Sequence, residues 1–309
     1  MKLNRNGILL LDKPKGISSN RALSLVKKIF CPKKAGHAGT LDPLATGILP
    51  ILFGEATKFA EYGLNSNKRY LAEISLGTKT STGDSEGEII EKISFTENVD
   101  IKSVLKSFIG EQFQMPPMFS ALKYNGIPLY KYAREGQEIA RNSRLINIKS
   151  IKFISLNNKV LKIDVVCSKG TYIRTLAEDI GKRLGSCAHL SALRRIGIGA
   201  LEIGQTITID KLAQLADSSS SFLNDALKPI ELFINHWPSV QLVKSNENNF
   251  LNGQLIKMFC PSIQDKEECL VRVYGFSNNF LGTGQIIDNK QLRPVRLISK
   301  TNFINAYYE

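Results

Sequence analysis

The segment Gly36–Gly54, GHAGTLDPLATGILPILFG, is the most informative stretch of this 309-residue chain for its fold. Three glycines in it allow positive φ and close approach of the backbone: Gly36, Gly39 and Gly47. Pro43 restricts Asp42 to an extended or turn conformation. The segment then enters an apolar stretch, Ile48–Phe53, which predicts a buried strand. We therefore expect a structured loop carried by a strand, where reactive side chains are often found.

Asp42 is the only acid in this segment and His37 is its only imidazole. A simpler interpretation of Asp42-Pro43 is a turn in which the aspartate side chain accepts a hydrogen bond from the backbone two residues further on. For an isolated pair that interpretation is favoured. The length of this loop and its high content of turn formers favour a functional role for its acid instead.

Composition limits the class of protein. A hydrophobic content of 43% and a charged content of 22% are ordinary for a globular protein. The net charge is +13, and most of the surplus lies before residue 239. Such a basic surface suits a polyanion such as nucleic acid, but composition alone leaves the partner open.

No apolar run approaches the roughly 20 residues that span a bilayer, and the N-terminus lacks the apolar core of a signal peptide. The five cysteines are an odd number and form no CxxC pair, and the three histidines show no ligand spacing. This usage predicts reduced thiols in a cytoplasmic protein, without a disulfide framework or a zinc site.

Periodicity predicts an α+β fold followed by an all-β region. Before residue 239 the expected strands are Gly7–Leu11, Lys68–Leu76, Glu88–Ile93, Leu145–Leu156 and Val160–Cys167. The expected helices are Asn20–Ile29, Glu55–Leu64, Thr96–Ile109, Tyr172–Leu184, Ile209–Leu215 and Ser221–Leu227. After residue 239 short strands alternate with turns: Val240–Val243, Gly253–Met258, Cys269–Tyr274, Phe280–Ile287 and Leu292–Leu297.

Several blocks of the chain resemble the signatures of the bacterial tRNA pseudouridine-55 synthases, the TruB-type enzymes. They are GHAGTLDPLATGILP with the GEATKF that follows soon after it, DKPKGISS, the KRY that begins at Lys68, SKGTYIRTLAEDIG and HLSALRRIGI. The resemblance implies a catalytic domain on a mixed or antiparallel sheet, residues 1–238, and a small all-β barrel of PUA type, residues 239–309. It also implies an RNA-clamping insertion at about 114–140, and it makes HLSALRRIGI the closing strand of the catalytic sheet.

The resemblance also implies roles for individual side chains of the site. Asp42 matches the catalytic nucleophile, Tyr70 matches the ring that stacks on the target base, and Arg174 matches the partner of the nucleophile. Tyr172 matches a tyrosine placed near C5 of the base, and Leu193 matches a position that touches the base. His37 matches a contact to the flipped loop. Beyond these six site residues, Asp84 matches an acid next to the active site.

Elementary chemistry gives several of these positions a second interpretation. A strand tyrosine such as Tyr70 is usually a core residue whose hydroxyl is satisfied, and a loop imidazole such as His37 is often a local hydrogen-bonding device. Arg174 is unusual because a cation in the first turn of a helix opposes the helix dipole, which indicates a partner. Arg194 and Arg195 are expected to face phosphate or solvent.

The predicted activity is isomerisation of uridine to pseudouridine at position 55 in the T loop of tRNA, by base flipping. The resemblance implies no cofactor, no metal, no membrane and no obligatory protein partner. One alternative is a chaperone that binds tRNA and helps it fold. Another is a base-excising glycosidase, which would need a pair of carboxylates where this loop offers one.

Overall fold

The computed structural model describes Leu3, residues 5–96, 99–218, Leu223, and residues 225–258, 268–288 and 290–299. Cys260 and part of the predicted helix Ser221–Leu227 lie outside the described residues. The four described cysteines are free: Cys31, Cys167, Cys187 and Cys269.

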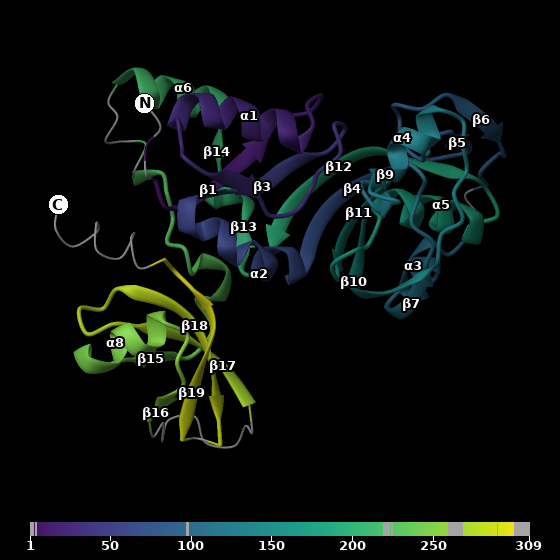
Figure 1. Ribbon diagram of the computed structural model, residues 1–309. Coiled ribbons are helices and arrows are strands. Elements are labelled where there is room, and N and C mark those ends of the chain that lie inside the picture. Colours follow the sequence, from purple (N-terminus) through teal and green to yellow (C-terminus); the bar gives the residue numbers. More distant parts are fainter. Residues whose placement is uncertain are drawn as a thin grey trace.

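A ten-stranded mixed sheet forms the frame of the larger part of the chain (Figure 1). Its main path runs in this order: β14 (Ile207–Thr208), β1 (Gly7–Lys13), β3 (Thr46–Phe53), β12 (Ala188–Ile198), β4 (Lys68–Leu76), β11 (Val160–Cys167), β10 (Arg144–Asn157) and β7 (Gly110–Gln114). Two short strands join it at the side, β2 (Ala35–His37) on β3 and β13 (Leu201–Glu202) on β12. The β1–β14 and β3–β12 pairs are parallel and the others are antiparallel, so the predicted mixed sheet is confirmed.

The strand that the resemblance names as the closing strand of the catalytic sheet is β12. It lies in the middle of the sheet, between β3 and β4. It pairs in parallel with β3 through Arg194 and Arg195, and in antiparallel fashion with the whole length of β4. Because it hydrogen-bonds on both sides, β12 joins the half of the sheet that carries the Asp42 loop to the half that carries Tyr70.

Helices cover the sheet in two groups. Helix α1 (Ser19–Phe30) and helix α6 (Ile209–Ser218) lie together near β1 and β14, whereas α3 (Ile101–Lys106) and α5 (Ile173–Arg183) lie at the other end (Figure 1). The Ser18 side chain caps α1 by accepting the N–H of Arg21 at 3.2 Å. The observed helix α3 is shorter than the predicted helix Thr96–Ile109. Its start is capped by Asp100, so α3 begins only at Ile101.

The remaining elements connect these layers. They are the 3₁₀ turns η1 (Gly54–Phe59), η2 (Ile203–Gln205) and η3 (Leu232–Ile234), the helices α2 (Ala60–Asn65) and α4 (Leu129–Arg134), and two hairpins, β5 (Thr78–Thr80) with β6 (Ile89–Lys92) and β8 (Lys123–Tyr124) with β9 (Ile127–Pro128). The β8–β9 hairpin and α4 lie within the predicted insertion, residues 114–140.

The core explains why β1 is apolar at successive positions. Leu9 and Leu11 point to the cluster that includes α1, while Ile8 and Leu10 point to a second cluster with Phe233. Successive side chains of a strand point to opposite faces, so a strand covered on both faces has no polar alternation.

The C-terminal part is a five-stranded sheet with its own hydrophobic cluster. Its order is β15 (Ser239–Gln241), β17 (Glu268–Tyr274), β18 (Phe280–Ile287), β19 (Gln291–Leu297) and β16 (Ile256–Lys257). Among the described residues β15 and β16 do not pair, so this sheet is curled into a half-barrel rather than closed. The all-β expectation also missed helix α8 (Lys244–Leu251). The boundary between residues 238 and 239 stays a prediction.

The glycines of the Gly36–Gly54 segment differ in their constraints. Gly39 and Gly47 have φ of 104° and 103°, as predicted, but Gly36 does not have a positive φ. A Cβ on Gly47 would collide with the carbonyl of Arg195, whereas a Cβ on Gly36 would have no neighbour within 4 Å. Gly47 therefore allows β3 to approach β12 closely, and Gly36 does not have this role.

We expect Gly47→Ala to lower the free energy of unfolding by about 3 kcal/mol, because it combines a strained φ with an overpacked backbone contact. Gly36→Ala is the matched control and should change it by less than about 0.5 kcal/mol. Urea denaturation of both variants checks this. Equal free energies of unfolding for the two variants would show that β3 and β12 can move apart to accept the added methyl group without cost.

Candidate active site

Two side chains from the N-terminal segment hold the loop that carries Asp42. The Ser19 hydroxyl accepts the N–H of Leu41 at 2.8 Å and donates to the Leu41 carbonyl at 3.0 Å. The ammonium of Lys13, which is fully buried, donates to the carbonyls of Pro14, Ile17 and Pro43 at 2.8, 2.8 and 3.5 Å. These bonds fix the residues on both sides of Asp42.

Arg195 holds the same loop from the sheet. Its guanidinium donates to the carbonyls of Ile48, Gly39 and Thr40 at 2.8, 3.0 and 3.4 Å, and the residue is only 1% exposed. The expectation that Arg195 faces phosphate or solvent is therefore wrong. Three backbone carbonyls replace the water that a buried guanidinium would otherwise need.

The predicted ion pair between Arg174 and Asp42 is present. Arg174 Nε lies 3.0 Å from Asp42 Oδ2, and Arg174 Nη1 lies 3.6 Å from Asp84 Oδ2. The remaining donors of Arg174 reach the carbonyls of Thr82 at 3.0 Å and Phe119 at 2.6 Å. Arg174 is thus fixed by four groups, which accounts for a cation in the first turn of α5.

Burial and Arg174 act on Asp42 in opposite directions. Burial raises the pKa of the Asp42 carboxyl above its ordinary value, Arg174 lowers it, and the charge of Asp84 raises it again. The net shift of the Asp42 pKa is upward. The Asp42 side chain is 41% exposed, so water still solvates its carboxylate.

Five of the six predicted site residues line one cavity of about 380 Å³: Asp42, Tyr70, Tyr172, Arg174 and Leu193. They come from the Asp42 loop, β4, α5 and β12, so the cavity lies where the two halves of the sheet meet. His37 lines an adjoining cavity of about 560 Å³, to which Asp42 and Arg174 also belong. Asp42 and its partner therefore form part of the wall between the two cavities.

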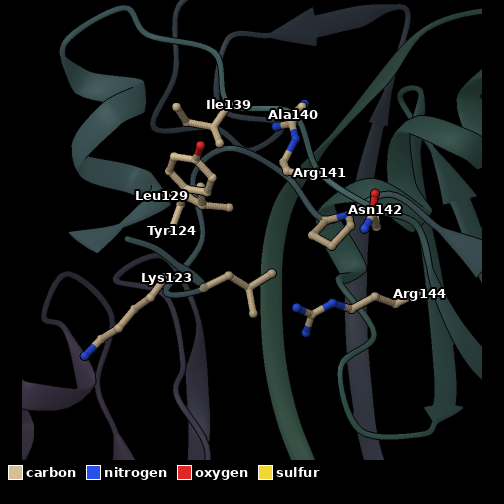
Figure 2. A pocket seen from close by; sticks show the side chains of 10 residues that line it. Lys123, Tyr124, Leu129, Ile139, Ala140, Arg141, Asn142 and Arg144 are labelled. Atoms are coloured by element: carbon tan, nitrogen blue, oxygen red, sulfur yellow. The ribbon is translucent and has the colours of Figure 1, made fainter. Parts of the chain in front are cut away.

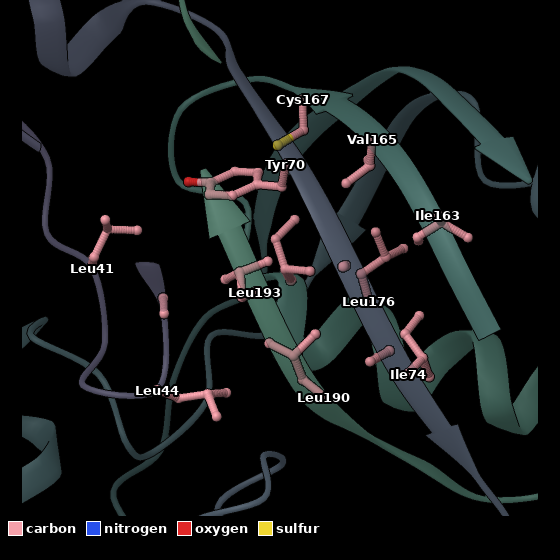
Figure 3. Close-up of a cluster of buried hydrophobic side chains, with 14 of the residues drawn as sticks. Leu41, Leu44, Tyr70, Ile74, Ile163, Val165, Cys167, Leu176, Leu190 and Leu193 are labelled. Atoms are coloured by element: carbon pink, nitrogen blue, oxygen red, sulfur yellow. The ribbon is translucent and has the colours of Figure 1, made fainter. Parts of the chain in front are cut away.

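Tyr70 belongs both to the core and to the cavity wall. It is 9% exposed and packs in the main hydrophobic cluster, where Figure 3 shows its ring close to Leu193 and its hydroxyl directed toward the side of Leu41. Burial raises the pKa of this hydroxyl and the neighbouring Arg195 opposes that rise. The phenol is thus a neutral, flat surface beside Asp42.

Lys68 is a site residue that the sequence prediction missed. It lines the cavity, and its buried ammonium donates to the carbonyls of Gly63, Leu64 and Ser66 at 3.2, 2.5 and 2.6 Å. Burial lowers the pKa of Lys68 to about 8. The strand period contained the signal, because residues 68 and 70 of β4 point to the same face.

His37 occupies a more isolated position. Burial lowers the pKa of its imidazole, and the charge of Arg195 acts in the same direction. Its Nδ1 is buried and has no hydrogen-bond partner among the described residues. The interpretation of His37 as a local hydrogen-bonding device is therefore not supported at Nδ1.

The insertion closes one side of the cavity. Ser120, Ala121 and Leu122 contribute to its wall, and Leu122 also lines a smaller pocket of about 170 Å³ within the insertion. Figure 2 shows this pocket between Arg144, whose guanidinium points inward, and the segment that carries Ile139.

Within the described residues, no group of three His, Cys, Asp or Glu side chains could hold a metal ion. No helix in that part of the chain is long and apolar enough to cross a membrane. The absence of a cofactor in the reaction stays a prediction.

Comparison with known structures defines the class of protein. The fold resembles a Cbf5-Nop10-Gar1 complex, with a TM-score of 0.72 and 26% identity over 96% of this chain and 86% of that one. It also resembles the archaeal box H/ACA sRNP Nop10-Cbf5 complex, with a TM-score of 0.71 and 22% identity over 96% of this chain and 87% of that one. Fold and cavity together define a protein of the Cbf5 and TruB type of pseudouridine synthase.

Sequence comparison then gives the family. Residues 27–173 match the TruB family pseudouridylate synthase N-terminal domain, residues 174–235 match the tRNA pseudouridylate synthase B C-terminal domain, and residues 238–298 match the C-terminal region of pseudouridine synthase II TruB. The chain is 45% identical to tRNA pseudouridine synthase B of Buchnera aphidicola over 97% of its length and 98% of the relative's. It is 40% identical to that of Stutzerimonas stutzeri over 95% of each chain. The chain belongs to the TruB family of pseudouridine synthases.

Removing Arg174 should raise the pKa of Asp42 further, because Arg174 supplies the charge that opposes the effect of burial. Carboxyl carbon NMR of the wild type and of Arg174→Met across pH 3–8 measures this. Arg194→Met is the matched control, since Arg194 pairs at 2.6 Å with Asp12 instead. An Asp42 pKa that falls or stays constant in Arg174→Met would contradict the assigned ion pair.

Proposed function

We propose that this chain isomerises uridine to pseudouridine at position 55 in the T loop of tRNA. The observation that carries the proposal is a carboxylate, Asp42, ion-paired to Arg174 in the wall of a cavity that also exposes an aromatic ring, Tyr70. The support from relatives is the name tRNA pseudouridine synthase B on chains 40–45% identical over nearly their full length. A solved H/ACA complex bound to a substrate RNA has the same fold, with a TM-score of 0.70.

The reaction breaks the bond between C1′ of the ribose and N1 of uracil, and then joins C1′ to C5 of the same base. The proton that leaves C5 balances the proton that N1 gains, so the reaction needs no oxidant, reductant or second substrate. The uridine must leave its stack to enter the cavity that holds Asp42. Asp42 is the nucleophile that acts on the sugar–base bond, and Arg174 favours its ionised form.

The base is held by the surrounding wall. The Tyr70 ring offers a flat surface for stacking, and Leu193 supplies an apolar contact beside it. Tyr172 lies in the same wall, and burial raises the pKa of its hydroxyl, so it remains neutral near C5 of the base. His37 contacts the rest of the flipped loop from the adjoining cavity.

The insertion and the basic surface bind the RNA outside the cavity. The insertion carries rings and cations in close sequence, and Arg134 lies over the Tyr130 ring with 5.5 Å between its guanidinium carbon and the ring centroid. We place the protein in the cytoplasm with its tRNA substrate. No observation favours a chaperone role as the main activity.

Asp42→Asn should abolish pseudouridine formation, by at least about 10³-fold, and leave the Kd for T-arm RNA within about threefold. The amide keeps the shape of the side chain and removes the nucleophile. Asp164→Asn is a control that alters another paired acid, since Asp164 pairs with Arg69 at 2.6 Å away from the cavity. Product from Asp42→Asn at the wild-type rate would refute the role of Asp42, and loss of product together with loss of RNA binding would count against a purely chemical role.

Affinity for tRNA should fall steeply with salt, because phosphate contacts release counterions. We expect the slope of log K against log[salt] to be about −0.7 to −0.9 for each phosphate contact. Arg134→Ala should make this slope shallower by the amount that corresponds to about one phosphate contact. Filter binding between 50 and 300 mM salt measures both, and a flat response in the wild type would contradict the role of the basic surface.

A further inference from the structure

Gln114 makes two hydrogen bonds to the backbone of a single residue of the proposed active site. Its Oε1 accepts the N–H of Tyr172 at 2.8 Å, and its Nε2 donates to the Tyr172 carbonyl at 3.1 Å. The two residues are 58 positions apart in sequence, and Gln114 is only 5% exposed. A primary amide is suited to this task because it offers one donor and one acceptor side by side.

The residue that Gln114 holds begins helix α5. Tyr172 is the N-cap of this helix, with an extended backbone, and its carbonyl accepts the N–H of Leu176 at 3.0 Å. No side chain of its own caps the helix start. The amide of Gln114 satisfies the Tyr172 N–H, which lies ahead of the first helical bond.

Holding both peptide groups of Tyr172 fixes more than the helix start. It sets the direction in which the Tyr172 side chain enters the cavity, and it sets the first turn of α5, which carries Arg174 two residues later. Arg174 in turn positions Asp42 through the 3.0 Å contact between Nε and Oδ2. A displacement of about 1 Å at such a site can lower a rate by about 10²-fold.

The position of Gln114 in the fold also links the insertion to α5. It is the last residue of β7, where it pairs with Arg144 of β10, and it is the first residue of the insertion. Five residues later, the carbonyl of Phe119 accepts a hydrogen bond from Arg174 at 2.6 Å. The start of the insertion is therefore bonded to α5 at two points, Tyr172 and Arg174.

We propose that Gln114 is a positioning residue for pseudouridine formation, which aligns Tyr172 and Arg174 by clamping the backbone at the start of α5. The inference rests on the proposed function, because its effect is read as a rate of isomerisation. Gln114 is buried and acts through other residues, so its loss should lower the chemical rate and leave RNA affinity unchanged.

Gln114→Glu gives a distinctive test. The neutral acid of this variant can still accept from the Tyr172 N–H and donate to its carbonyl, whereas the ionised form places a negative oxygen against that carbonyl. Burial and this carbonyl raise the pKa of the introduced acid. The charged neighbours are Arg144 on β10 and Arg174 and Asp42 at the cavity, and both arginines are unchanged in the variant. Asp42 is common to variant and wild type.

We therefore expect the single-turnover rate of Gln114→Glu, divided by that of the wild type, to fall at least about tenfold from pH 5.5 to 8.0. Gln114→Met, which can make neither bond, should be about 10- to 100-fold slower than the wild type at every pH. Both variants should bind T-arm RNA with a Kd within about threefold of the wild type. Tritium release from 5-labelled uridine in tRNA measures the rate.

Gln112→Glu is the matched control. Gln112 lies on the same face of β7 and donates to the Phe108 carbonyl at 2.7 Å rather than to Tyr172. The rate of Gln112→Glu divided by that of the wild type should therefore not change with pH. A constant ratio for Gln114→Glu, or a wild-type rate for Gln114→Met, would overturn the inference. So would loss of folding in both variants, since Gln114 would then be structural. A wild-type protein that forms no pseudouridine would refute the proposed function instead.

Discussion

The contact between Arg174 and Asp42 is the interaction on which the proposed site depends. It joins the loop before β3 to the first turn of α5, and these elements lie on different halves of the ten-stranded sheet. Burial raises the pKa of Asp42 and Arg174 opposes that rise. The guanidinium is itself held by Asp84 and by two backbone carbonyls, so its position does not depend on Asp42 alone.

Buried cations surround this ion pair, and backbone carbonyls rather than acids satisfy them. Lys13, Lys68 and Arg195 each donate to three carbonyls and are almost inaccessible to solvent. Because no carboxylate neutralises them through these bonds, their charge acts on the cavity that an anionic RNA would enter. Burial lowers the pKa of both Lys13 and Lys68 to about 8, because it disfavours the charged form of each ammonium.

The central position of β12 makes the arrangement possible. Its parallel contact with β3 is short and passes through Gly47, where the lack of a side chain admits the Arg195 backbone. Its antiparallel contact with β4 brings Arg195 opposite Tyr70. One strand therefore fixes the Asp42 loop, the proposed stacking ring and the buried arginine relative to one another.

The order of the residues is enough to predict the local elements and the candidate site residues. Strands β4 and β11 and the start of α1 follow from periodicity and capping, and the place of Arg174 in the first turn of a helix is enough to indicate a partner. The central position of β12, the burial of Arg195, the upward shift of the Asp42 pKa and the clamp by Gln114 arise only when the chain is folded. Each of these depends on groups distant in sequence, and periodicity reports which face a residue occupies but not what packs against that face.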